Sequence, residues 1–123
     1  MDIAERRALL ETQANPNKTM DYIVTLKASG PTQQSVNFRY IPDKVILSSD
    51  VFAAYITTVL SQDNNLETSA TTILEDMNNE LVPRWLQVIM TNQDGNGAEH
   101  HVTIEDHQPQ WKNDSLLARL SKL

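Results

Sequence analysis

Apolar and polar residues alternate in two short segments near the start of the chain. The apolar residues Tyr22, Val24 and Leu26 occupy every second position, and the same period returns in residues 36–40. A period of two is typical of β-strands, in which successive side chains point to opposite faces of a sheet. Gly30-Pro31 separates the two segments, so we predict two strands joined as a hairpin.

The middle of the chain changes to a helical period. In residues 50–62 and again in residues 66–81 the apolar side chains form one stripe, which is the pattern of a helix that packs one face on a core. Two further β-rich runs, residues 85–90 and 98–105, enclose a stretch of Asn, Asp and Gly residues that suits a hairpin turn. The predicted order is strand, strand, helix, helix, strand, strand.

Both ends of the chain carry amphipathic patterns. Residues 2–12 mix apolar and charged side chains in a helical pattern that begins at Asp2, a good helix-capping residue. The tail, residues 106–123, holds a tryptophan and four leucines. A helical segment this short is not stable alone, so we expect it to dock on the rest of the protein. We predict one domain over residues 1–123, with its core between about residues 14 and 105.

Composition and charge exclude several classes of function. The chain has 16 acidic against 10 basic residues, and its basic residues are scattered apart from the pair Arg6-Arg7. Nucleic-acid binding usually requires a clustered basic face, so no nucleic-acid partner is expected. Residues 1–20 show no secretory signal, and no apolar stretch is long enough to cross a bilayer. We therefore expect a cytoplasmic protein without a membrane partner.

Four short motifs stand out along the chain, namely Asn15-Pro16, Arg39-Tyr40-Ile41-Pro42-Asp43, Ile73-Leu74-Glu75-Asp76 and Pro83-Arg84-Trp85-Leu86. Their residues and spacing resemble one known family, the NADPH-dependent nitrile reductases that reduce 7-cyano-7-deazaguanine in queuosine biosynthesis. The resemblance covers roughly residues 14–105. It implies the α+β tunnelling fold, in which a four-stranded antiparallel sheet carries two helices on one face and several subunits join into a barrel, and so it implies a homo-oligomer.

The chemistry of that family needs residues that this sequence lacks. Reduction of a nitrile by a nicotinamide requires a thiolate that attacks the nitrile carbon and an acid that protonates nitrogen. The family places this cysteine and an aspartate shortly before the motif that begins here at Arg39. Residues 25–35 contain neither, and the whole chain has no cysteine. We therefore expect no catalytic nucleophile, no disulfide and no reductase activity.

The family's cofactor signature is also altered. It reads Glu-Ser-Lys-Ser-x-Lys-x-Tyr, whereas residues 48–55 read Ser-Ser-Asp-Val-Phe-Ala-Ala-Tyr, so only Ser49 and Tyr55 match. Both lysines that would meet cofactor phosphates are missing, and Asp50 replaces one of them with a charge that repels an anionic dinucleotide. We expect no cofactor at this place.

One functional position of the family is retained. Family members carry His-Glu before the second helix, and this chain reads Leu66-Glu67. The resemblance implies that Glu67 anchors a purine-like or pterin-like ring at a subunit boundary, because a carboxylate accepts two N–H bonds in parallel. The alternative is an ordinary acid in the first turn of a helix, where the helix dipole favours negative charge. Ser48 and Ser49 are further candidates for ring contacts, although helix capping is the commoner role of serines at such a place.

The histidines suggest a metal site only weakly. His101, Thr103 and Glu105 share one face of the last predicted strand, and Asp106-His107 follows. Side chains two residues apart on a strand are separated by about 7 Å, which favours a polar surface over a set of metal ligands. We therefore predict no metal site.

Three functional interpretations remain open. The first is a catalytically silent or repurposed family member that binds a purine-like, deazapurine or pterin ligand through Glu67, or that serves only as a structural oligomer. The second is an enzyme with different chemistry on a pterin or deazapurine, with Glu67 and a histidine as base. The third is a subunit of a heteromer in which another chain supplies the missing catalytic residues.

Overall fold

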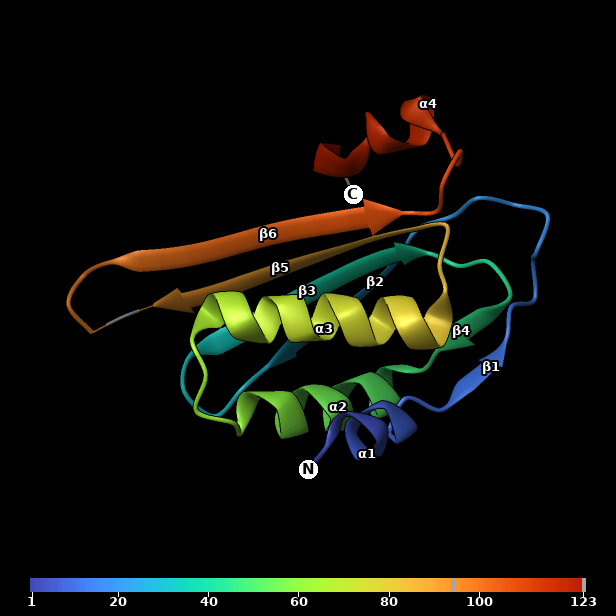
Figure 1. The fold of residues 1–123 in the computed structure, drawn as a ribbon. Coiled ribbons are helices and arrows are strands. Elements are labelled where there is room, and N and C mark those ends of the chain that lie inside the picture. The colour runs from blue at the N-terminus through green and yellow to red at the C-terminus, as the bar shows by residue number, and fades with distance from the viewer. Residues whose placement is uncertain (94, 123) are drawn as a thin grey trace.

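The computed structural model describes residues 1–93 and 95–122 and is organised around a four-stranded antiparallel sheet (Figure 1). The strands are β2 (Val24–Ser29), β3 (Gln34–Ile41), β5 (Trp85–Gln93) and β6 (Glu99–His107), and the long helices are α2 (Ser49–Leu60) and α3 (Leu66–Leu81). The spatial order is β2-β3-β5-β6. Both helices cover one face, α2 over β2 and α3 over β5 and β6. The predicted arrangement of two hairpins and two helices is confirmed.

Strand alternation divides this sheet into an inner face under the helices and an outer face. On the inner face Phe38 pairs in register with Leu26 and Val88. The inner face is apolar, and its burial against the helices is the main driving force for folding. The outer face carries polar side chains, among them Lys27 and Asn37. Core residues include Val36, Phe38, Tyr40, Phe52, Tyr55, Ile56, Ala70, Ile73, Met77, Leu86, Val88 and Met90.

Side-chain caps fix where the two long helices begin. Ser48 caps α2, and its hydroxyl accepts a hydrogen bond from the Val51 amide at 3.3 Å. Asn65 caps α3 by accepting from the Thr68 amide at 2.7 Å.

The N-terminal segment departs from the sequence prediction. The helix expected over residues 2–12 is confined to α1 (Ile3–Ala8), with Asp2 as its cap. Residues beyond it form β1 (Thr12–Ala14), which pairs with β4 (Val45–Leu47) in a separate two-stranded sheet. The two strands are three residues long and were not predicted, because a run this short is too brief to show a period.

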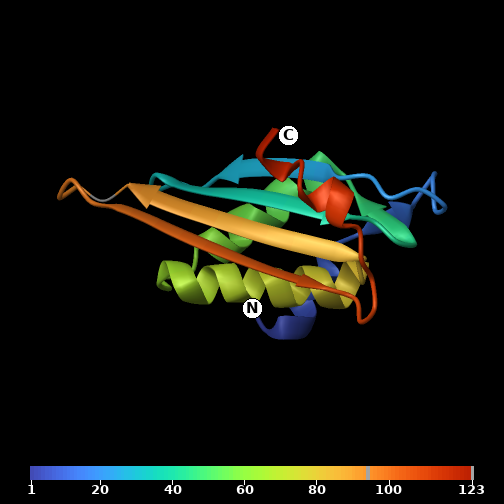
Figure 2. The same cartoon turned by 90° about the horizontal axis from the view of Figure 1, so that it is seen from above.

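The C-terminal segment lies on the outer face of the main sheet, opposite α2 and α3 (Figures 1 and 2). It contains α4 (Asp114–Leu117) and a short 3₁₀ turn, η1 (Leu120–Lys122). Arg39 Nη1 on the sheet donates to the Leu120 carbonyl at 3.1 Å. The predicted docking of the tail is thus observed, while Leu123 and the hairpin residue Asp94 fall outside the described residues. Within residues 1–93 and 95–122, no helix has both the length and the apolar character to cross a membrane.

Candidate functional site

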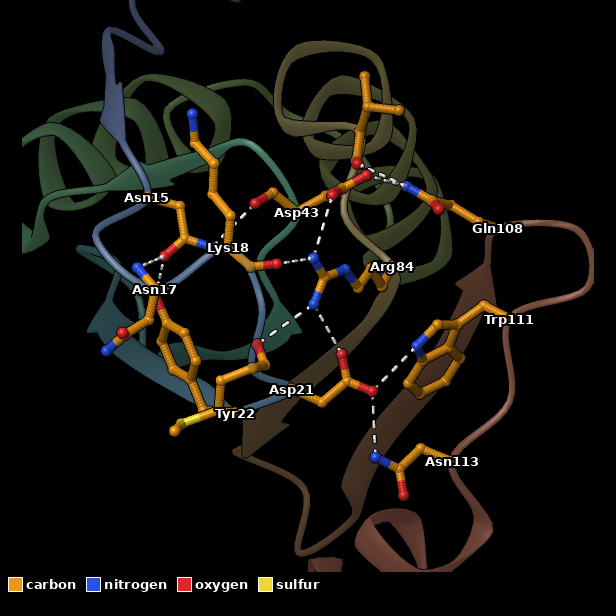
Figure 3. Close-up of polar contacts among 12 residues, drawn as sticks. Asn15, Asn17, Lys18, Asp21, Tyr22, Asp43, Arg84, Gln108, Trp111 and Asn113 are labelled. Atoms are coloured by element: carbon orange, nitrogen blue, oxygen red, sulfur yellow. Dashed lines mark hydrogen bonds and ion pairs between the residues drawn. The ribbon is translucent and has the colours of Figure 1, made fainter.

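Residues from three of the four sequence motifs meet at one end of the sheet around Arg84 (Figure 3). The Arg84 guanidinium lies 2.8 Å from Asp21 Oδ1 and 3.3 Å from Asp43 Oδ1. It also donates to the backbone carbonyls of Lys18 and Met20. Through these contacts Arg84 joins residues 18–21 to Asp43. This arginine therefore has a structural role.

Asn15 holds the neighbouring loop in the same cluster. Its side-chain amide donates to the Asp43 carbonyl at 2.8 Å, and its Oδ1 accepts from the Tyr22 hydroxyl at 2.5 Å and from the Asn17 amide at 3.0 Å. Asn15 is buried. A buried amide with all these bonds made stabilises the loop at little desolvation cost.

The C-terminal segment is attached to this cluster through Asp21. Trp111 Nε1 and Asn113 Nδ2 both donate to Asp21 Oδ2, at 3.2 and 3.0 Å. Gln108 reaches Asp43 Oδ2 at 3.0 Å. Burial acts to raise the pKa of the Asp21 carboxyl, but hydrogen bonds from Asn113, Arg84 and Trp111 outweigh burial and lower that pKa. No local sequence pattern indicates a role for Asp21, because its partners Arg84, Trp111 and Asn113 lie far away along the chain.

A second buried cluster joins α1 to the helical layer through Asp76, which is fully buried. Arg6 Nε and Arg7 Nε lie 2.5 and 2.8 Å from its carboxylate oxygens. The Tyr55 hydroxyl donates to Asp76 Oδ2 at 2.5 Å. Tyr55 is the retained tyrosine of the cofactor signature, so here its hydroxyl is engaged inside the protein. The adjacent basic pair Arg6-Arg7 was the visible sequence signal for this cluster.

The donors around Asp76 set its charge state. Burial acts to raise the pKa of the Asp76 carboxyl, but the hydrogen bonds from Arg6, Arg7 and Tyr55 are stronger and lower the pKa. Desolvation and the adjacent carboxylate raise the pKa of the Tyr55 hydroxyl. At neutral pH the Asp76 carboxyl is therefore ionised and the Tyr55 hydroxyl is protonated, and their hydrogen bond stabilises the fold.

The segment before Arg39, where members of the resembled family carry their catalytic groups, contains a tight turn between β2 and β3. Gly30 N donates to the Gln34 carbonyl at 2.8 Å, and Ser29 pairs directly with Ser35. A Cβ atom on Gly30 would lie 2.6 Å from Leu60 Cδ1, so the turn also packs closely on the end of α2. The Ser35 hydroxyl is hydrogen-bonded to Thr91. No acid or thiol is present in this turn to replace the family's catalytic groups.

The predicted ligand residue Glu67 lies in the first turn of α3 with its side chain 63% exposed. His100 Nε2 approaches Glu67 Oε2 at 3.3 Å. Threonines of α3 line a shallow surface hollow of about 270 Å³ beside it. A carboxylate in this position still has oxygen lone pairs open to solvent and can accept N–H bonds from a ring.

Ser48 and Ser49 are not brought together with Glu67 within one chain. They lie at the N-terminal end of α2, and Glu67 lies at the N-terminal end of α3, where the connection from the other end of α2 arrives (Figure 1). The 12 residues of α2 span about 18 Å. Ser48 is used as the helix cap, whereas Ser49 is exposed.

The remaining histidines make separate local contacts. His101 lies 3.4 Å from Glu99, and His107 Nδ1 lies 2.8 Å from the Gln108 carbonyl. Glu105 accepts from Trp85 Nε1 at 2.9 Å. In the part of the chain that the structure describes, no three acidic or histidine side chains converge as metal ligands would.

Comparison with known proteins relates this architecture to one family. Residues 31–111 match the sequence model of the family described as QueF-like protein. The chain is 30% identical over 112 residues to an NADPH-dependent 7-cyano-7-deazaguanine reductase from Syntrophus aciditrophicus (strain SB), an alignment that covers 83% of this chain and 80% of the relative.

One solved structure supports the fold. The apo crystal structure of the archaeosine synthase QueF-Like superposes with a TM-score of 0.52 at 19% identity, over 71% of this chain and 91% of that chain. A putative dihydroneopterin aldolase (FolB) from Vibrio cholerae O1 biovar El Tor str. N16961 aligns with a TM-score of 0.43 at 14% identity, over 80% and 98% of the two chains. The predicted α+β tunnelling fold is confirmed, and the chain belongs to the QueF-like protein family.

Proposed function

We propose that this chain is a QueF-like protein without nitrile reductase activity that binds a purine-like, deazapurine or pterin ring through Glu67 at a subunit boundary. The observation that carries the first half of the proposal is the absence of any cysteine from the sequence. Without a thiolate, the covalent adduct from which such a reduction proceeds has no counterpart on this chain.

The tight β2–β3 turn supports the same half of the proposal. The turn is closed by the hydrogen bond from Gly30 N to the Gln34 carbonyl. The two strands are therefore not joined by a long loop that could carry a catalytic pair. The hydroxyl of Tyr55, which matches the tyrosine of the cofactor signature, donates a hydrogen bond to Asp76. Asp50, in the first turn of α2, is exposed where the family signature has a lysine, so an anionic dinucleotide is disfavoured there.

The accessibility of Glu67 supports the second half of the proposal, that the chain binds a ring ligand. Its carboxylate is exposed and the dipole of α3 stabilises its charge, so it is ready to accept two N–H bonds. In a homo-oligomeric barrel, which we propose for this chain in the cytoplasm, the edge strands β2 and β6 gain partners for their free backbone groups. A neighbouring subunit would then complete the surroundings of Glu67.

A thermal-shift screen with guanine, deazaguanines and pterins tests the ligand half. The wild-type chain is expected to be stabilised by at least one of these rings, and Glu67→Ala is expected to lose that stabilisation. Glu75→Ala, which removes another exposed acid of α3, is the matched control and should respond as the wild type does. Equal responses of wild type and Glu67→Ala would reject Glu67 as the anchor.

The reductase half has its own test. NADPH oxidation is followed with 7-cyano-7-deazaguanine and the purified chain, free of other proteins, and no substrate-dependent oxidation is expected. Turnover by the purified chain would overturn this half while leaving the ligand half to the screen.

One contact favours a second candidate function. The 3.3 Å approach of His100 to Glu67 places an acid and an imidazole side by side, as a general base and its orienting partner would be. We propose as the alternative an enzyme that does different chemistry on a pterin or deazapurine. Product formation from a ring found in the screen, lost in both Glu67→Gln and His100→Asn, would select this alternative, whereas binding without turnover would reject it.

A further inference from the structure

The turn between β5 and β6 contains a pair of residues that can react with each other. The hairpin formed by these strands projects beyond the helical layer (Figures 1 and 2). Asn96 and Gly97 lie in its connecting loop, and both residues are exposed. Of the ten asparagines in the chain, Asn96 is the one that is followed by glycine. Solvent water therefore reaches both members of an Asn-Gly pair.

The glycine makes ring closure at this place easy. The amide nitrogen after an asparagine can attack the asparagine Cγ atom and form a five-membered ring, and no second molecule has to be brought into position. A side chain on the attacking residue would hinder this approach and restrict the backbone, whereas glycine does neither. Gly97 has a φ of +88°. Among the described residues, no atom beyond its chain neighbours lies within 4 Å of the place where its Cβ would be, so the turn has space to change shape as the ring closes.

A hydrogen bond prepares the Asn96 side chain for this attack. The backbone N–H of Ala98 donates to Asn96 Oδ1 at 3.0 Å. This bond folds the side chain back along the chain, over the backbone of the residue that attacks it. Negative charge develops on Oδ1 when Cγ becomes tetrahedral, and an N–H group already aimed at that oxygen stabilises the charge. The Ala98 amide thus lowers the barrier to ring closure.

The other asparagines have surroundings that oppose the same reaction. Asn15 is buried and precedes Pro16, whose nitrogen has no proton to lose. Asn78 and Asn79 lie within α3, where the following amide nitrogens are held in helical hydrogen bonds. Asn37 lies within β3, before a bulky phenylalanine. Exposure, a following glycine and a hydrogen bond to the side-chain oxygen come together at Asn96.

We propose that Asn96-Gly97 is a site of spontaneous covalent modification, at which Asn96 deamidates through a cyclic imide with the help of the Ala98 amide. Gly97 N loses its proton to solvent and bonds to Asn96 Cγ. The Cγ–Nδ2 bond breaks, and ammonia leaves. Water then opens the ring at either carbonyl, giving aspartate or isoaspartate at position 96. Every reactant other than water belongs to the chain, and no oxidant or reductant is needed.

The product changes both charge and geometry at the end of the hairpin. It adds one negative charge to a chain of net charge −6. Isoaspartate also lengthens the main chain by one carbon atom inside the turn, which weakens the nearby pair Gln93 and Glu99. The next residue on β6 is His100, which contacts Glu67. The modification therefore acts beside the candidate ring-binding residue, although the inference does not depend on ring binding.

Ageing of the purified full chain tests the proposal. The protein is incubated at neutral pH, digested with trypsin and analysed by tandem mass spectrometry. The mass increase that accompanies conversion of an amide to an acid is expected at Asn96, with isoaspartate as part of the product. Asn92, on β5 in the same tryptic peptide, is the internal control and should stay unchanged. Asp94-Gly95 can close a similar ring, but it loses and regains water, so it produces no change in mass.

Two variants of Ala98 test the role of the hydrogen bond. Ala98→Pro removes the N–H donor but keeps the Asn-Gly pair, and it should slow the reaction about tenfold. Ala98→Ser keeps the donor and is the matched control, with an unchanged rate expected. Ala98 precedes the edge strand β6, a place where proline is tolerated. A stable Asn96, equal rates at Asn92 and Asn96, or equal rates in the two variants would overturn the proposal.

Discussion

The two ends of helix α3 carry carboxylates in opposite surroundings. Asp76, towards the C-terminal end, is fully buried and accepts hydrogen bonds from Arg6, Arg7 and Tyr55. The side chain of Glu67, in the first turn, is 63% exposed, and His100 Nε2 lies 3.3 Å from its carboxylate. A carboxylate with all its oxygens engaged can only hold the fold together, whereas an exposed carboxylate is available to a ligand.

The residues that resemble the family form the fold, whereas the positions of the family's chemistry have changed. Asn15, Asp43, Arg84 and Asp76 come from the motifs that resemble the family, and each is engaged in internal hydrogen bonds or ion pairs. These motifs therefore report the architecture. Chemistry in this family depends on other positions, and there the chain has a short turn and no thiol.

The largest effect is expected from removing the buried carboxylate. Asp76→Ala leaves two guanidinium groups and the Tyr55 hydroxyl without their common partner, so we expect the free energy of unfolding to fall by about 3 kcal/mol. Urea unfolding at neutral pH measures it. Glu75→Ala, next to it on the exposed side of the same helix, should change stability by less than about 0.5 kcal/mol. A similar loss in both variants would contradict the structural role assigned to Asp76.

Acid should weaken the same cluster. The pKa of Asp76 is lowered from its usual value of 3.8, so below that value the unfolded chain binds more protons than the folded protein. The free energy of unfolding should therefore fall as the pH drops from above 3.8 through the lowered folded-state pKa. Urea midpoints across this range measure the slope.

Asp21 shares the acid response, because its pKa is also lowered. Asp76→Ala should therefore show a shallower acid slope than the wild type, not a flat one. An unchanged slope in this variant would mean that Asp76 does not stabilise the fold through its charge.

The Arg84 cluster should show an intermediate effect. Arg84→Ala removes ion pairs to Asp21 and Asp43 whose side chains are only 22% and 29% exposed, and we expect a loss of about 2 kcal/mol. Because Asp21 also holds Trp111 and Asn113, amide exchange in the C-terminal segment should accelerate. Arg119→Ala, an exposed arginine of that segment, is the control and should leave stability nearly unchanged. Unchanged exchange in the tail would show that the cluster does not anchor it.

How far the sequence could predict the fold depended on the length of each element. Strand β3 and helix α3 are long enough to show their periods, so both were predicted with nearly their observed bounds. Strands β1 and β4 have three residues each, and their pairing is decided by tertiary contact. The helix predicted to reach Thr12 instead ends at Ala8, since the chain must turn there to form β1.

The surroundings of the candidate ligand residue Glu67 could not be predicted from the sequence. Glu67 could be singled out from its place before the second helix, yet its contact with His100 depends on how β6 lies against α3, which no local pattern encodes.

The smallest effect tests whether Glu67 is really free. A double-mutant cycle with Glu67→Gln and His100→Asn should give a coupling energy below about 0.5 kcal/mol, because the two side chains are 63% and 39% exposed and water screens their interaction. Urea unfolding of the wild type, both single variants and the double variant measures it. A coupling above about 1.5 kcal/mol would place Glu67 with Asp76 as a residue that holds the fold. The contrast between the two ends of α3 would then disappear, and the ring-binding proposal would lose its anchor.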